Sequence, residues 1–202
     1  MKVGILGGTF NPVHNGHLKI AGTAMRRLKL DHVLFVPARV PPLRSSRGVA
    51  TARHRFEMVR LATQKYPRFL ISSVEMERPG KSYAVDTLKI LRKIYKKGTQ
   101  FYFIVGADCL PQLHAWREIG KLSRLCEFAV VTRGGFQLKK LKPADLKLTP
   151  AVFRRVTRHL ISIAPVKVSA TVIRERTRAK KSLTGLVPKE VARYILKNKL
   201  YR

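Results

Sequence analysis

Short apolar runs alternate with longer amphipathic stretches along this chain. Six runs predict buried strands of a parallel sheet, and they cover residues 3–6, 33–36, 69–74, 101–105, 128–132 and 159–164. Elsewhere apolar residues recur at spacings of three and four, which is typical of helices that pack one face against a sheet. The alternation of strand and helix predicts an α/β fold built from βαβ units.

Capping signals place several of the expected helices. Thr51 and Ser169 can each accept a hydrogen bond from the first turn of a helix, and Pro188 stands near the start of the last one. In the helix after Thr51, we expect the apolar residues Phe56, Val59 and Ala62 to lie on one face. The other helical patterns cover residues 15–30, 85–95, those after Ser169, and 187–200.

The length of 202 residues fits one domain over residues 1–202, with the C-terminal part, 165–202, as a helical subregion. No stretch approaches the roughly 20 apolar residues of a membrane span, and glycines interrupt the N-terminal apolar run. A cytoplasmic protein is therefore expected. Cys109 and Cys126 fit no CxxC or zinc spacing, so we expect free thiols in or near the core.

Charge is the compositional outlier, because 42 Lys and Arg residues face 11 Asp and Glu residues, giving a formal net charge of +31. Such an excess favours nucleic-acid binding. The basic residues are nevertheless spread over the whole chain, without a basic tail or a known RNA-binding motif. A solvated surface whose field attracts anionic nucleotides explains the charge equally well, so weak nucleic-acid binding is kept as a secondary property that the function does not require.

Residues that suit anion binding are grouped at the end of the first strand. Gly7 and Gly8 follow the apolar run, and a helical pattern opens at Asn15. Helix N-termini present unsatisfied N–H groups, and glycines let backbone amides approach a phosphate, so this junction predicts an anion site. His14 and His17 lie three residues apart and share a face if both belong to the first helical turn.

Thr9 and Asn11 add short polar side chains to the same junction. The patterns GxxxxGK[ST] and GxGxxG are both absent, which weakens a P-loop or plain NAD-binding hypothesis. Either histidine alone could be a surface or capping residue. Two histidines and two glycines around one strand end favour phosphate binding instead.

Two further positions suit nucleotide binding. Asp108 follows the strand at 101–105 and could accept a ribose hydroxyl or cap a helix. Ser169, Thr171 and Arg174 place hydroxyls and a guanidinium at a second helix N-terminus, which is either a second phosphate site or an ordinary cap.

The loop of residues 38–50 contains three arginines and follows a strand end, where open α/β sheets bind ligands, although a surface loop has the same composition. Trp116 is the only tryptophan, and its ordinary role would be a packing anchor.

The first motif, GGTFNPVHNGH, resembles the HxGH signature of nucleotidyltransferases. Later motifs are similar, in the same order, to those of bacterial nicotinate-nucleotide adenylyltransferases, and they read PARVPPLR, RPGKSYAVDTL, FIVGADCLPQLHAW, TRGG, VSATVIRER and GLVPKEVARYI. The resemblance covers nearly the whole chain. It implies a Rossmann-like, doubly wound parallel sheet of the nucleotidyltransferase type, and transfer of AMP from ATP to nicotinate mononucleotide, which forms deamido-NAD and pyrophosphate in NAD biosynthesis.

The resemblance also implies roles for individual residues. Those expected to stabilise the reacting phosphates are His14, His17 and Arg174. Those expected to bind ATP are Gly7, Gly8, Thr9, Phe10, Asn11, Gly16, Gly106, Asp108, Ser169, Thr171 and Ile173. Those expected to bind the acceptor are Arg44, Tyr83, Ala84, Asp86, Trp116, Arg117 and Arg133. No protein metal site is expected, and Mg²⁺ should arrive bound to ATP, because no carboxylate cluster offers a cage.

Three positions depart from the family pattern. Leu43 replaces a histidine, Ala84 replaces a threonine that often follows Ser-Tyr, and Ala170 replaces the second serine of a Ser-Ser-Thr run. Two alternatives stay open. One is a related adenylyltransferase for nicotinamide mononucleotide or phosphopantetheine, and the other is a non-catalytic, basic nucleic-acid-binding protein on the same scaffold.

Overall fold

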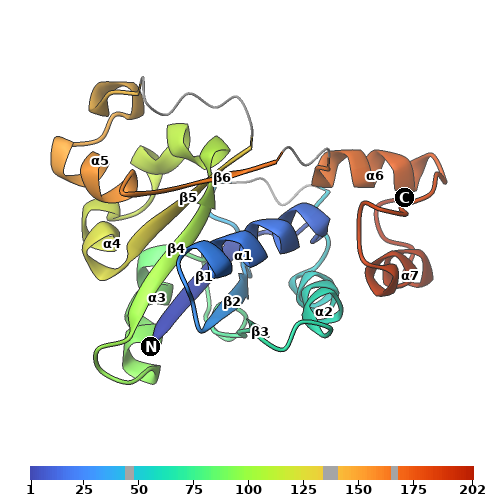
Figure 1. Cartoon of the computed structure of the whole chain (residues 1–202). Helices are drawn as coiled ribbons and strands as arrows, with labels where there is room; N and C mark the ends of the chain where they lie inside the picture. Colours follow the sequence, from blue (N-terminus) through green and yellow to red (C-terminus); the bar gives the residue numbers. More distant parts are fainter. Residues whose placement is uncertain (44–47, 134–140, 165–167) are drawn as a thin grey trace. The chain divides into compact units, whose positions relative to one another are not determined.

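The computed structural model describes residues 1–43, 48–133, 141–164 and 168–202, and Figure 1 shows their strands and helices coloured along the chain. The strands are β1 (Lys2–Gly8), β2 (His32–Pro37), β3 (Phe69–Ile71), β4 (Gln100–Gly106), β5 (Glu127–Arg133) and β6 (His159–Ile163). The α-helices are α1 (Asn15–Arg27), α2 (Ala52–Thr63), α3 (Ala84–Ile94), α4 (Ile119–Leu125), α5 (Pro150–Val156), α6 (Ala170–Arg178) and α7 (Lys189–Lys197). The 3₁₀ helices within the described ranges are η1 (Ala107–Ala115) and η3 (Pro143–Leu146).

The strands form one sheet in the order β3-β2-β1-β4-β5-β6. Pairing is parallel, with Val3 opposite Phe101 and Ala129 opposite His159. The chain therefore begins in the middle of the sheet and builds first one half and then the other, which is the doubly wound arrangement. The predicted Rossmann-like α/β fold is confirmed. Its topological switch point lies between β1 and β4.

Contacts divide the chain into two compact units, each made of separate segments. The first unit comprises Met1–Gly7, Ile20–Val33 and Tyr83–Pro165, and the second comprises Gly8–Lys19, Leu34–Ser82 and Val166–Arg202. The single domain predicted over residues 1–202 would require these two units to join into one, and it stays a prediction.

The core of the first unit surrounds β4 and β5. Both strands are apolar on both faces, so residues 101–105 and 128–131 are buried where helices cover the sheet. Cys109 and Cys126 are free thiols, as expected. Cys126 is buried, and this burial raises the pKa of its thiol to about 12.

The core of the second unit lies where α2 contacts α7. Met58 of α2 and Val191 of α7 are fully buried. A hydrogen bond of 2.9 Å between His54 Nδ1 and the Tyr194 hydroxyl joins the same two helices. Helices α6 and α7 both lie in the C-terminal segment of the chain. Among the described residues, no helix is long and apolar enough to cross a membrane.

The first helix ends at Arg27, three residues before its predicted end at Leu30. Lys29 takes a left-handed φ of 52°, and the Leu30 N–H donates to the Met25 carbonyl at 2.9 Å. This is a Schellman-type ending, in which the residue after the left-handed turn packs back as an apolar contact. Leu30 therefore continues the apolar pattern while lying outside the helix.

The third strand is also shorter than predicted, because β3 ends at Ile71 and not at residue 74. The Ser72 N–H still donates to the Phe35 carbonyl at 2.9 Å, but a turn begins at Ser73, whose carbonyl accepts from the Met76 N–H at 2.7 Å. The polar residues Ser72 and Ser73 follow Ile71 and lead into this turn, which ends the strand before Val74.

The spacing pattern predicted neither α4 nor α5. Each has seven residues, which is too short for a helical period to be visible. A local signal was available for α5, because Thr149 accepts a hydrogen bond from the Val152 N–H and Pro150 occupies the first helical position.

Candidate active site

Residues 8–17, called here the histidine loop, connect β1 to α1 within the second unit. Phe10 anchors this loop, because its side chain is buried and its ring lies 6.0 Å from that of Phe35 and 5.0 Å from that of His17. The backbone of Phe10 takes a left-handed φ of 48°, which non-glycine residues rarely adopt. Burial of the aromatic ring offsets this conformational cost and sets the path of the loop.

The two imidazoles of the loop lie together, as the sequence predicted. The rings of His14 and His17 are stacked with centroids 3.7 Å apart and an interplanar angle of 23°. The His14 backbone N–H donates to His17 Nδ1 at 3.2 Å. Because Nδ1 of His17 accepts, the neutral ring carries its proton on Nε2, which can then donate to an anion.

Gly16 makes room for His14. A Cβ at residue 16 would lie 3.0 Å from two ring atoms of His14 and 3.1 Å from Val168 Cγ1. Those distances are tighter than ordinary van der Waals contact, so a side chain there would push the imidazole out of its stack.

We therefore expect Gly16→Ala to lower kcat by about tenfold or more, since a displaced imidazole no longer matches the reacting phosphates. Gly120→Ala is the matched control, because a Cβ at that helical glycine meets only Val152 Cγ2, at 3.9 Å. Steady-state kinetics of both variants, with melting temperatures, would check this. Equal kcat values for the two variants would contradict the proposed function of Gly16.

Helix α6 brings a guanidinium to the histidine loop. Arg174 Nη1 donates to the Asn11 carbonyl at 2.9 Å, and its Nη2 donates to Thr171 Oγ1 at 3.1 Å. Ser169 caps the helix by accepting from the Val172 N–H at 3.3 Å. Ile173 is fully buried and fixes the rotation of the helix. The second predicted phosphate site thus lies beside the first.

The side chain of Asn11 makes two hydrogen bonds to the backbone of another segment. Its Nδ2 donates to the Gly48 carbonyl at 3.1 Å, and its Oδ1 accepts from the Ala50 N–H at 3.0 Å. The side-chain amide therefore holds the segment before α2, while the backbone carbonyl of Asn11 accepts from Arg174. Gly8 lies against the Phe10 ring, since a Cβ on this glycine would be 3.4 Å from that ring.

In the first unit, Gly106 and Asp108 end β4 and open η1. A Cβ on Gly106 would collide with Asp108 Oδ1, so this carboxylate occupies the space that only a glycine leaves. Asp108 is exposed, as a group that accepts from a ribose hydroxyl must be. Gly7 ends the part of β1 in this unit and packs against Phe103.

Trp116 lies at the end of η1 and is half-buried. Its ring meets that of Phe103 edge-on, with centroids 5.6 Å apart and an interplanar angle of 80°. The Trp116 ring is therefore fixed on one side by packing and partly exposed, which suits both the packing role and the acceptor-binding role that were expected.

Tyr83 and Arg117 also meet in the first unit. The Arg117 guanidinium lies 4.8 Å from the centre of the Tyr83 ring, and its Nη1 is 3.6 Å from Asp86 Oδ2. Tyr83 is the N-cap of α3 but makes no side-chain hydrogen bond to its first turn. The N–H group of Ala84 at this helix start is thus not capped by that side chain.

The side chains of two residues that were expected to bind the acceptor substrate are not described by the structure. Arg44 lies outside the described residues. Arg133 is the last residue of β5, and its side chain also lies outside the described part of the chain.

Sequence reasoning missed Arg55, which points inward from α2 and is 1% exposed. The buried face of α2 consists of Arg55, Met58, Val59, Ala62 and Thr63, whereas Phe56, which was expected on it, is half-buried. Spacing was the available signal, since residues 55, 58, 59 and 62 follow the helical pattern of an apolar stripe. An arginine at a position of such an apolar stripe is a candidate for a buried side chain that bonds polar groups of the backbone.

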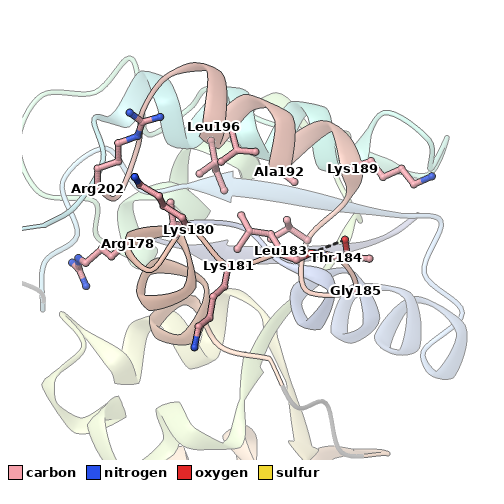
Figure 2. A pocket seen from close by; sticks show the side chains of 14 residues that line it. Arg178, Lys180, Lys181, Leu183, Thr184, Gly185, Lys189, Ala192, Leu196 and Arg202 are labelled. Atoms are coloured by element: carbon pink, nitrogen blue, oxygen red, sulfur yellow. Dashed lines mark hydrogen bonds between the residues drawn. The ribbon is translucent and has the colours of Figure 1, made fainter.

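A cavity of about 710 Å³ lies between α6 and α7 (Figure 2). Its lining combines apolar residues, among them Leu183 and Leu196, with basic ones, among them Arg178, Lys181 and Arg202. Of the described residues that the sequence predicts for the site, none lines this cavity, so it is distinct from the candidate active site. Within the described part of the chain, no cluster of three or more His, Cys, Asp or Glu residues could hold a metal ion.

Comparison with known proteins gives consistent matches. A family model described as cytidylyltransferase-like matches residues 5–176. The nicotinate-nucleotide adenylyltransferase of Bacillus subtilis is 37% identical, over 99% of this chain and 98% of that relative. A protein of Moorella thermoacetica, named a probable nicotinate-nucleotide adenylyltransferase, is 39% identical over 100% of this chain and 92% of its own length.

A solved structure of Plasmodium falciparum nicotinic acid mononucleotide adenylyltransferase, complexed with NaAD, has the same fold. Its TM-score is 0.73 at 19% identity, with 99% of this chain and 97% of that chain covered.

Proposed function

Because the chain belongs to the nicotinate-nucleotide adenylyltransferase family, we infer that it transfers AMP from ATP to nicotinate mononucleotide. The products are deamido-NAD and pyrophosphate, and the reaction is a step of NAD biosynthesis. One structural observation carries this inference. The stacked His14–His17 pair and Arg174 converge on one backbone loop, which gives the site donors and positive charge for a polyphosphate.

The chemistry needs positioning and charge stabilisation. An oxygen of the acceptor's 5′-phosphate forms a bond to the α-phosphorus of ATP, while the bond from that phosphorus to the oxygen leading to the β-phosphorus breaks. The electron pair leaves with pyrophosphate. Since the nucleophile is already an anion, neither a strong base nor a covalent protein nucleophile is required.

We assign charge stabilisation to the histidine loop and α6. His17 would donate from Nε2, held in that tautomer by the His14 N–H, and His14 would complete the donor pair. Arg174 would neutralise the growing negative charge, with the N-terminal amides and Thr171 of α6 around the phosphates. Ser169 would act through its cap, and Ile173 by fixing the helix. Gly7, Gly8, Thr9, Phe10, Asn11 and Gly16 would shape the loop around ATP.

Other residues that the family resemblance implies would bind the sugar and the pyridine. Asp108 would accept from the adenosine ribose at Gly106, and Trp116 would stack on the nicotinate ring. The start of α3 at Ala84 would receive the nicotinate carboxylate, with Arg117 beside it on Tyr83. Asp86 would hold Arg117. Roles for Arg44 and Arg133 on substrate phosphate stay predictions.

Mg²⁺ is proposed to enter with ATP as part of the substrate, held by phosphate oxygens and water. The cytoplasm is the proposed location, since both substrates are charged nucleotides that do not cross a bilayer unaided.

An acceptor panel tests the function. Purified protein with MgATP should release pyrophosphate with nicotinate mononucleotide, and the panel adds nicotinamide mononucleotide and phosphopantetheine. Turnover confined to phosphopantetheine would assign the chain to another acceptor. Absence of turnover with every acceptor, together with salt-sensitive nucleic-acid binding, would favour the non-catalytic alternative.

A further inference from the structure

Arg55 is the most deeply buried charged side chain among the described residues of the second unit. Its guanidinium donates to four backbone carbonyls. Nε bonds the Ala50 carbonyl at 2.9 Å, Nη1 bonds those of Thr9 at 2.8 Å and Ala38 at 2.5 Å, and Nη2 bonds that of Arg39 at 2.9 Å.

Burying a guanidinium is costly unless its donors are satisfied. Among the described residues, no carboxylate forms an ion pair with Arg55, so the carbonyl dipoles, with a favourable interaction from the Tyr201 side chain, offset the lost hydration. Burial accordingly lowers the pKa of Arg55 from its ordinary value. The buried guanidinium of Arg55 therefore serves to hold these four backbone carbonyls in place.

The four carbonyls belong to three separate segments. Thr9 lies in the histidine loop, Ala38 and Arg39 follow β2, and Ala50 precedes α2. None of these four residues lies in a helix or a strand, so their carbonyls have no ladder partner of their own. Arg55 thus binds all three segments to one another through a single side chain.

Two of these segments, the histidine loop and the one before α2, meet again at Asn11, two residues after Thr9. The Asn11 side chain bonds the backbone of residues 48 and 50, and the backbone carbonyl of Asn11 accepts from Arg174. The histidine loop is therefore held on one side through Thr9 by Arg55 and on the other through Asn11 by Arg174. A shift of Thr9 would move the carbonyl that orients Arg174.

We propose that Arg55 is a positioning residue for adenylyl transfer, which fixes the histidine loop so that Arg174 and His17 meet the triphosphate in the reactive geometry. This inference rests on the proposed function. Arg55 acts through the backbone and touches no substrate. Displacement of such a loop by a fraction of an ångström is expected to reduce the rate far more than the stability.

Arg55→Lys is the first test, because lysine keeps the charge but cannot reach several carbonyls with one planar fork. We expect kcat to fall about 10- to 100-fold and the ATP affinity, measured by calorimetry without acceptor, to weaken several-fold. The KM for nicotinate mononucleotide should stay within about twofold. Arg60→Lys is the control on the same helix, since Arg60 is exposed and pairs with Glu57.

Chemical rescue separates positioning from stability. Arg55→Ala should recover kcat when guanidinium chloride is added at millimolar, non-denaturing concentration, and not when sodium chloride is added. Wild-type kcat and ATP affinity in a folded Arg55→Lys protein would overturn the inference. A wild-type protein without turnover on nicotinate mononucleotide would instead overturn the proposed function.

Discussion

His17→Ala is expected to lower kcat by on the order of 10²-fold or more, the largest effect of any single imidazole in the chain. The His17 ring is held by stacking on His14, by the edge of Phe10, and by the N–H that bonds its Nδ1. A donor fixed in this way needs no reorganisation when charge grows on the leaving pyrophosphate. Its loss should therefore act on the transition state more than on the ground state, so KM for ATP should change little.

Rapid assay of pyrophosphate release, with ATP and acceptor varied separately, would measure this effect. His159→Ala is the control, because His159 begins β6 in the first unit and pairs with Glu127 at 3.3 Å. It should keep the wild-type kcat. Turnover of His17→Ala at the wild-type rate would exclude a charge-stabilising role for His17.

Arg174→Ala is expected to lower kcat by about 10²-fold and to raise KM for ATP, because the guanidinium is the one cation bonded to the histidine loop from α6 within the described residues. Arg174→Lys should recover only part of the loss. A lysine supplies the charge, but its single ammonium cannot span the Asn11 carbonyl and Thr171 in the fixed geometry of a guanidinium.

The matched control for Arg174 is Arg178→Ala, which removes an exposed arginine one helical turn later on α6, at the cavity in Figure 2. Both variants reduce the net charge by one, so a general loss of electrostatic attraction for ATP would affect them equally. Equal kinetics of the two variants would show that Arg174 contributes only long-range charge.

The sequence alone was sufficient where the determining signal is local. Glycines after the first apolar run and histidines three residues apart predicted the histidine loop and its two imidazoles. Hydroxyl residues before apolar periods predicted the caps at Thr51 and Ser169, and both hydrogen bonds are present. These features depend on residues that are close together in the sequence, within one helical turn or at one strand end. The sequence is therefore sufficient to predict them.

Boundaries were less predictable, for a related reason. Leu30 continues the apolar pattern of α1 beyond the end of the helix, since apolar side chains also pack in turns. Val74 was assigned to the third strand although Ser72 and Ser73 lead into a turn before it. The short α4 and α5 offered too few residues for a period.

What the sequence determined by itself was the alternation of strands and helices and the residue types gathered at the first strand end. The tertiary structure decided which distant segments share that end. It assigned the Asn11 side chain to residues 48 and 50, joined Arg174 to the Asn11 carbonyl, and turned Arg55 inward to four carbonyls. These contacts join residues between 5 and 163 positions apart, and the energy that selects them, the satisfaction of buried polar groups, exists only once the core has formed.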